Sequence, residues 1–132
     1  MDKLSFEKLV GEVGFSPVPE KFRDKLSNVV LTIEDEPDNE IRRSEHLGPD
    51  ETLLGLYVGV PLPERGEYYG VGMTLPDRII LFRLPILAAA KEDKISVRIV
   101  VEETIWHEVG HHFGLSEEDI ASRTFRQPTD SF

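Results

Sequence analysis

The chain contains, at residues 96–121, the segment SVRIVVEETIWHEVGHHFGLSEEDIA. Its first eighteen residues hold no proline and a single glycine, Gly110, and their apolar side chains recur at helical spacing on two sides of the predicted cylinder. A helix that is apolar on two sides is typical of the centre of a domain, where neighbours bury both sides. Residues 96–113 are therefore predicted to form a central helix, around which the rest of the chain packs.

Polar residues interrupt this apolar helix near its end. His107 and His111 are four residues apart, so their imidazoles lie one above the other on a single helical face. Two imidazoles at this spacing can hold one tetrahedral Zn²⁺ and leave room for a third ligand and a water. Glu108 is rotated by about 100° from His107, near enough to reach that water, and is the candidate catalytic base. His112 points away from the paired face and is interpreted as a packing residue.

The residues after the helix favour a third ligand. Gly114 lies where the helix must stop, which suits a left-handed C-cap, and Ser116 then begins a new helix with Asp119 in an approximate capping-box position. That turn brings Glu117 back toward the two histidines, as the third ligand of a His-Glu-x-x-His-x-x-Gly-x-x-Glu pattern. Acids are also common in the first turn of a helix because they suit its dipole. The alternative interpretation of Glu117 is therefore that it only stabilises the start of this helix. In that case Glu118 and Asp119 are the other candidates for the third ligand.

The composition favours one domain whose chemistry uses oxygen and imidazole groups. The chain has 132 residues, 39% of them hydrophobic, which is enough for one core, so residues 1–132 are expected to form a single domain. The absence of cysteine excludes thiolate ligands and a cysteine nucleophile. A formal net charge of −10 disfavours binding to nucleic acid or to an anionic membrane. Neither a signal peptide nor a membrane-spanning segment is recognisable, so a cytoplasmic location is expected.

The flanking sequence predicts short strands and helices without a βαβ rhythm, which favours an α+β fold with a small sheet of about three strands. Helices are expected over residues 4–13, after Pro19, and from Pro85 to about Asp93; strands are expected over residues 29–33, 53–60 and 78–83. Glycines within residues 53–60 suggest a bulge or a close backbone approach. Residues 34–51 are predicted to be a solvated polar loop, and residues 61–76 a long loop that serves as a lid or cleft wall.

With these motifs the chain resembles the small bacterial minimal zincins, which are zincin-like metallopeptidases. The resemblance extends from about Val29 to Ile120. It rests on LGLYVGVPLPERG at residues 54–66, LPDRIILFR at 75–83 and, most specifically, ETIWHEVGHHFGLSEEDI at 103–120. It implies a compact zincin-like fold in which a small mixed sheet packs against a central active-site helix. It also implies one Zn²⁺ ion held by His107, His111 and the acid at 117, with Glu108 as the base.

The predicted function is zinc-dependent hydrolysis of peptide bonds, with a peptide or protein as the substrate. The strand at residues 78–83 is expected to be an exposed edge that pairs with an extended peptide. Tyr68 and Tyr69 are candidates for support of the oxyanion. Two alternatives stay open: a metal-binding or protein-interaction domain with little catalysis, and a hydrolase of a non-peptide amide. The oligomeric state is not predicted.

Overall fold

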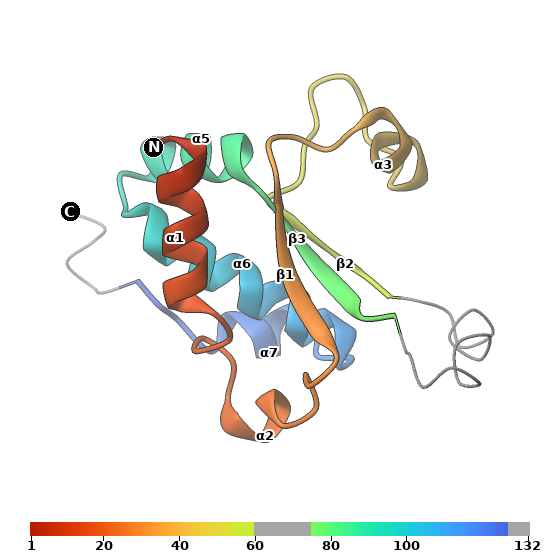
Figure 1. Ribbon diagram of the computed structural model, residues 1–132, viewed down its shortest axis with the longest axis vertical. Helices are drawn as coiled ribbons and strands as arrows, with labels where there is room; N and C mark the ends of the chain where they lie inside the picture. The colour runs from red at the N-terminus through yellow and green to blue at the C-terminus, as the bar shows by residue number, and fades with distance from the viewer. Residues whose placement is uncertain (60–74, 127–132) are drawn as a thin grey trace.

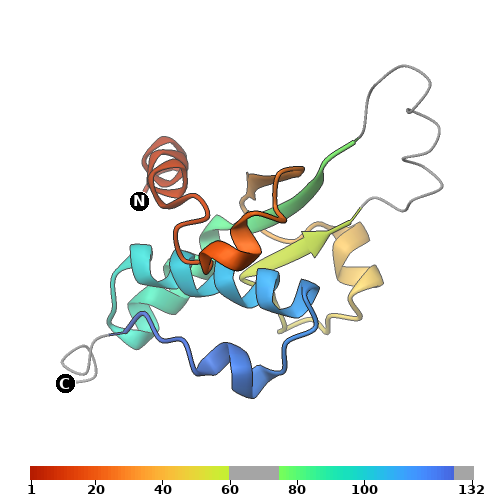
Figure 2. The ribbon, with the colours of Figure 1, turned by 90° about the horizontal axis from the view of Figure 1, so that it is seen from below.

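Helix α6 (Val97–His112) lies at the centre of the fold in the computed structural model, which describes residues 1–59 and 75–126 (Figures 1 and 2). The helix begins after Ser96, whose hydroxyl oxygen accepts a hydrogen bond from the backbone N–H of Ile99 at 3.2 Å. Its buried residues are Val100, Val101, Thr104, Ile105, Trp106, Val109 and Gly110. The predicted central helix is thus confirmed to within one residue at each end.

The described strands form one small mixed sheet. They are β1 (Val29–Glu34), β2 (Gly55–Val58) and β3 (Asp77–Phe82), in the order β1–β3–β2. β1 runs parallel to β3, whereas β2 runs antiparallel to it. A mixed sheet packed against separate helices confirms the predicted α+β class.

Strand β3 is the central strand of this sheet, and its residues 79–82 are all fully buried. The prediction that residues 78–83 form an exposed edge is therefore wrong. A continuous apolar run is typical of a strand that is covered on both faces, and Ile79–Phe82 is such a run. Among the described strands, β2 is the edge strand that packs against α6.

The helices share one apolar core with the sheet (Figure 1). Helix α6 packs against β2 and β3, while α1 (Lys3–Val13) and α5 (Arg83–Asp93) pack against α6. The core takes buried side chains from α1, β3, α5 and α6, including Phe6, Val10, Ile79, Leu81, Ile86, Val101 and Ile105. Within residues 1–59 and 75–126, no helix combines the length and the apolar character needed to cross a membrane.

The helix predicted after Pro19 is only a single turn, α2 (Glu20–Arg23). The chain leaves the helix at Asp24 and enters β1 at Val29, although Phe22, Leu26 and Val29 are spaced as on a helix. The run of β-branched residues that starts at Val29 pairs with β3, and this long-range pairing overrides the local helical spacing.

The segment predicted to be a solvated loop, residues 34–51, contains a short helix, α3 (Asn39–Ser44). Asp38 caps it, because a carboxylate oxygen of Asp38 accepts a hydrogen bond from the backbone N–H of Ile41 at 2.8 Å. Because this segment is rich in acidic residues, the sequence analysis did not recognise Asp38 as a helix cap. The strand predicted over residues 53–60 is confirmed in its middle part, and the loop predicted over residues 61–76 lies almost wholly outside the described residues.

Helix α7 (Glu117–Ala121) follows α6 after a tight turn. The backbone N–H of Gly114 donates to the carbonyl of His111 at 3.0 Å, and that of Leu115 donates to the carbonyl of Gly110 at 2.9 Å. These two bonds, with Gly114 at φ +80°, make a Schellman C-cap, and the left-handed C-cap predicted at Gly114 is confirmed. Ser116 then caps α7, because its hydroxyl oxygen accepts a hydrogen bond from the backbone N–H of Asp119 at 3.1 Å.

Candidate metal centre

The structure brings His107, His111 and Glu117 together at the junction of α6 and α7. Glu117 Oε2 lies 3.2 Å from His107 Nε2, and Glu117 Oε1 lies 2.6 Å from His111 Nε2. One potential ligand atom from each residue falls within 4.8 Å of the other two. Of the three acids proposed for the third position, Glu117 belongs to this group, whereas Glu118 and Asp119 do not.

The short turn between the helices determines where Glu117 lies. The Schellman cap ends α6 at His112, one residue after His111, and the Ser116 cap starts α7 with Glu117 as its first residue. The chain therefore reverses within a few residues and returns the carboxylate to the histidine face. The exposed fraction of the Glu117 side chain is 71%, so this position depends on the turn and on α7 rather than on burial of the carboxylate itself.

Helix α7 is held against α6 by two contacts. The indole Nε1–H of Trp106 donates to the carbonyl of Ile120 at 3.0 Å. The Ile120 side chain lies over Gly110, where an added Cβ would be 2.7 Å from Ile120 Cγ1. Because Gly110 has no side chain, α7 can pack closely against α6, and this packing places Glu117 beside the two histidines.

We expect Gly110→Ala to lower the free energy of unfolding by about 1–3 kcal/mol, because the new methyl group must displace Ile120 and with it α7. Urea denaturation measures this change. Gly11→Ala is the matched control: Gly11 is also helical, but no atom lies within 4 Å of an added Cβ, so the higher helix propensity of alanine should leave this variant as stable or more stable. Equal stability of Gly110→Ala and the parent protein would contradict the close packing of α7.

Glu108 lies beside the histidines and is held by both of its carboxylate oxygens. Its Oε1 accepts a hydrogen bond from the backbone N–H of Tyr57 on β2 at 3.0 Å, and its Oε2 lies 3.2 Å from His107 Nδ1. Only 17% of the Glu108 side chain is exposed. The carboxylate is therefore fixed between the sheet edge and the first histidine, without joining the three grouped residues.

A glycine on β2 allows this contact between sheet and helix. A Cβ at Gly55 would lie 2.7 Å from Thr104 Cγ2 and 3.6 Å from Glu108 Cγ. The strand backbone can therefore come close enough to α6 for the Tyr57 N–H to reach Glu108. The close backbone approach that the sequence suggests for this strand is confirmed at Gly55.

Tyr57 is a site residue that the sequence analysis missed. Its hydroxyl donates to Asp77 Oδ2 at 2.7 Å, and its ring stacks on His112 with centroids 4.0 Å apart. His112 accordingly lies outside the histidine pair, against the sheet edge, as expected for a packing residue. No local motif links Tyr57 to Glu108, since the two residues are 51 positions apart and meet only because β2 passes α6. Tyr68 and Tyr69 lie outside the described residues.

The donor set fits a zinc ion. Two imidazoles and one carboxylate are a common ligand set for Zn²⁺, and tetrahedral ligand atoms at usual bond lengths are about 3.3 Å apart. When Nδ1 of His107 donates to Glu108, its Nε2 presents a lone pair to Glu117. Two acceptors that face each other need a proton or a metal ion between them. Where protons rather than a metal ion fill these gaps, hydrogen bonds from His107, and then from His111, lower the pKa of Glu117 and so favour its ionised form.

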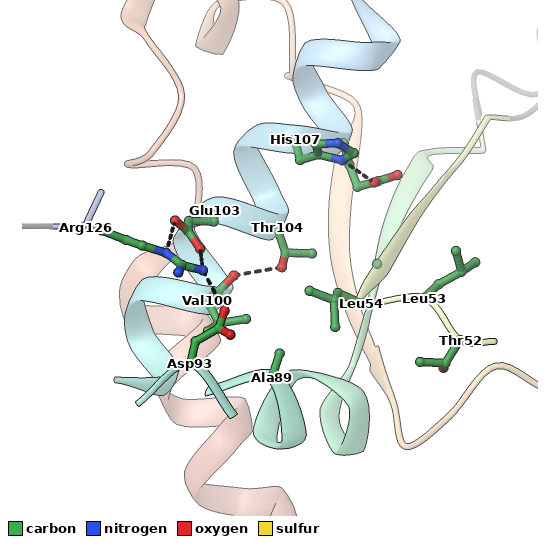
Figure 3. A pocket seen from close by; sticks show the side chains of 12 residues that line it. Thr52, Leu53, Leu54, Ala89, Asp93, Val100, Glu103, Thr104, His107 and Arg126 are labelled. Atoms are coloured by element: carbon green, nitrogen blue, oxygen red, sulfur yellow. Dashed lines mark hydrogen bonds and ion pairs between the residues drawn. The ribbon is translucent and has the colours of Figure 1, made fainter. Parts of the chain in front are cut away.

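An apolar cavity of about 340 Å³ opens beside this group (Figure 3). His107 and Glu108 form part of its wall, and the rest comes from α5, α6, residues 52–55 and Arg126. A second hollow, of about 260 Å³, lies on the α7 side of His107 and also touches Glu117. The grouped residues thus have room for a ligand on both sides.

Comparison with known protein families gives one finding for this chain. Residues 26–126 match the family described as zincin-like metallopeptidase. The match includes the whole described sheet, α6 and α7, and so all of the grouped residues and Glu108. A comparison with curated proteins gives no significant match.

Proposed function

The chain belongs to the zincin-like metallopeptidase family, and on this premise we propose that it is a zinc-dependent peptidase with Glu108 as its general base. One observation carries the proposal. His107, His111 and Glu117 offer ligand atoms within 4.8 Å of one another, directly beside a carboxylate that is held in place but is not part of the group. This arrangement separates the residues that hold a metal from the residue that moves a proton.

His107, His111 and Glu117 would hold the ion, with His107 oriented by its Nδ1 contact to Glu108. When bound, zinc lowers the pKa of a water toward about 7 and polarises a carbonyl group. The chain would supply one negative charge to the ligand set through the carboxylate of Glu117.

Glu108 would take a proton from the attacking water and return it to the leaving amine nitrogen. Its Oε1 accepts a hydrogen bond from the Tyr57 N–H and its Oε2 faces His107, so each oxygen keeps a second lone pair that could take the proton. Because the backbone of β2 holds Oε1, the carboxylate needs little reorganisation during the transfer.

We propose that an extended peptide or protein substrate lies along β2, rather than along the central strand β3. Backbone groups alternate in direction along an antiparallel strand. The Tyr57 N–H points away from β3, toward Glu108, and Gly55 shares this direction because it is two residues away. A substrate backbone placed there would pass beside Glu108 and the paired histidines.

The purified protein should bind one equivalent of zinc with micromolar or tighter affinity at neutral pH. The affinity should fall as the pH is lowered, because two imidazoles must each lose a proton to bind the metal. Glu117 should add less to this loss than an ordinary glutamate would, since its pKa is lowered. Competition with a zinc indicator dye between pH 5.5 and 8 measures the affinity. A folded sample that fails to bind zinc at neutral pH would refute the proposed metal centre.

A mixed peptide library, incubated with the protein and analysed by mass spectrometry, tests the activity itself. We expect cleavage that stops with a chelator and returns when zinc is added back. Zinc binding without cleavage of peptides or of small amide substrates would instead identify a metal-binding domain. Cleavage of the amides alone would identify a non-peptide hydrolase.

A further inference from the structure

The cavity beside the metal centre has apolar walls from three parts of the chain. Leu54 lies at the start of β2, Ala89 comes from α5, and Val100 and Thr104 come from α6 (Figure 3). The hydroxyl of Thr104 donates to the carbonyl of Val100 at 2.7 Å, so it is satisfied within its own helix. These walls favour a side chain that brings no charge into the cavity.

One end of the cavity is lined by an ion-pair cluster (Figure 3). Arg126 donates from Nε to Glu103 Oε2 at 2.9 Å, and from one terminal nitrogen to Glu103 Oε1 and to Asp93 Oδ2, both at 3.0 Å. The cluster joins the segment after α7 to α6 and α5. One guanidinium thereby engages both carboxylates at this end of the cavity.

The position of the cavity identifies what part of a substrate would enter it. His107 and Glu108 line the same cavity as Arg126, so the candidate metal centre and the cluster border one space. A group that occupies this space therefore lies next to Glu108. For a peptide bound with its scissile bond beside Glu108, that group would be the side chain of a residue adjacent to this bond.

Resting on the proposed function, we propose that this cavity receives an uncharged, apolar side chain adjacent to the scissile bond, and that Arg126 sets this preference. Arg126 acts by engaging Glu103 and Asp93, which would otherwise offer two unpaired carboxylates to a basic side chain. While Arg126 is present, a lysine side chain would have to compete with its guanidinium for both carboxylates. An acidic side chain meets a cluster whose formal charge is already −1, from one guanidinium and two carboxylates.

The test is a series of peptides that differ only at the residue next to the cleaved bond: alanine, leucine, phenylalanine, lysine and glutamate. For the parent protein, kcat/KM should be at least about tenfold higher for leucine or phenylalanine than for alanine, and lowest for the charged residues. Arg126→Met should raise the ratio of lysine to leucine cleavage by at least about tenfold, because it leaves Glu103 and Asp93 unpaired. Arg98→Met is the control. It removes an exposed arginine of α6 that does not line the cavity, and it should keep the parent preference.

Two further variants separate specificity from damage to the fold. Combining Arg126→Met with Glu103→Gln and Asp93→Asn removes all three charges and should restore the preference for leucine, which a merely disrupted fold would not do. Ala89→Phe fills the cavity and should favour the alanine peptide over the leucine peptide. Unchanged preferences in Arg126→Met and Ala89→Phe, with cleavage retained, would overturn the inference.

A binding experiment makes the result independent of turnover. N-acetyl-leucinamide and N-acetyl-lysinamide are titrated into Glu108→Gln, with the methyl resonances of Ala89 and Val100 followed by NMR. Perturbation of these resonances by the leucine probe alone supports the cavity assignment, even if no peptide is cleaved and the proposed function fails. Perturbation by neither probe, or by the lysine probe alone, contradicts the assignment even if peptides are cleaved.

Discussion

Glu108→Gln should retain zinc and lose turnover by at least about a hundredfold. Glutamine keeps the size of the side chain, and its carbonyl oxygen can still accept the hydrogen bond from the Tyr57 N–H. Its amide nitrogen, in the place of Oε2, cannot take a proton from water. Because Glu108 does not belong to the three grouped ligands, the metal content should remain near one equivalent.

The measurement pairs metal analysis with kcat/KM on the best peptide from the library. Glu102→Gln is the control, since it makes the same change on the same helix at a residue outside the grouped ligands and outside both cavities at the site. It should retain both zinc and activity. Full turnover by Glu108→Gln would show that any observed hydrolysis follows a different chemistry.

Glu117→Ala should weaken zinc binding by more than about a hundredfold, with activity lost because the metal is lost. Removal of a residue that only orients a ligand typically costs about 10–100-fold in metal affinity, and the loss of a direct ligand should exceed this. The carboxylate reaches both histidines, at 3.2 Å and 2.6 Å, and no other described acid is grouped with them. Added zinc at high concentration should restore part of the activity.

Glu118→Ala is the matched control for Glu117→Ala. It removes the neighbouring exposed carboxylate from the same helical turn and should leave zinc affinity unchanged. If Glu118→Ala or Asp119→Ala released the zinc and Glu117→Ala did not, the turn at Gly114 would present a different residue to the metal than the structure places there.

Local signals predicted most of the helical architecture. The central helix follows from its apolar spacing, and the turn after it follows from Gly114 and Ser116. Each of these features depends on backbone groups within about five residues of one another, so the sequence of that segment contains the whole interaction. The short helix α3 was missed, although its Asp38 cap is equally local, because the acidic composition around it favoured a loop.

The arrangement of the strands was harder to predict. The prediction of a strand at residues 78–83 is correct, but the prediction that it is an edge strand is wrong. The order of strands in a sheet depends on pairing between segments that are distant in the sequence. β3 pairs with both β1 and β2, and this central position buries its residues 79–82 completely. The uninterrupted apolar run at residues 79–82 correctly indicates a strand that is buried on both faces. The expected role in substrate binding wrongly indicated an edge strand.

The sequence by itself determined the spacing of His107, Glu108 and His111, because the period of an α-helix fixes which side chains share a face whatever surrounds the helix. It also determined the turn that returns Glu117 to that face. Only the tertiary structure decided which group holds Glu108 and which charged residues line the neighbouring cavity. The Tyr57 N–H reaches Glu108 across 51 residues, and Arg126 reaches Glu103 across 23. Such contacts arise from the packing of whole elements, and no short segment contains both partners.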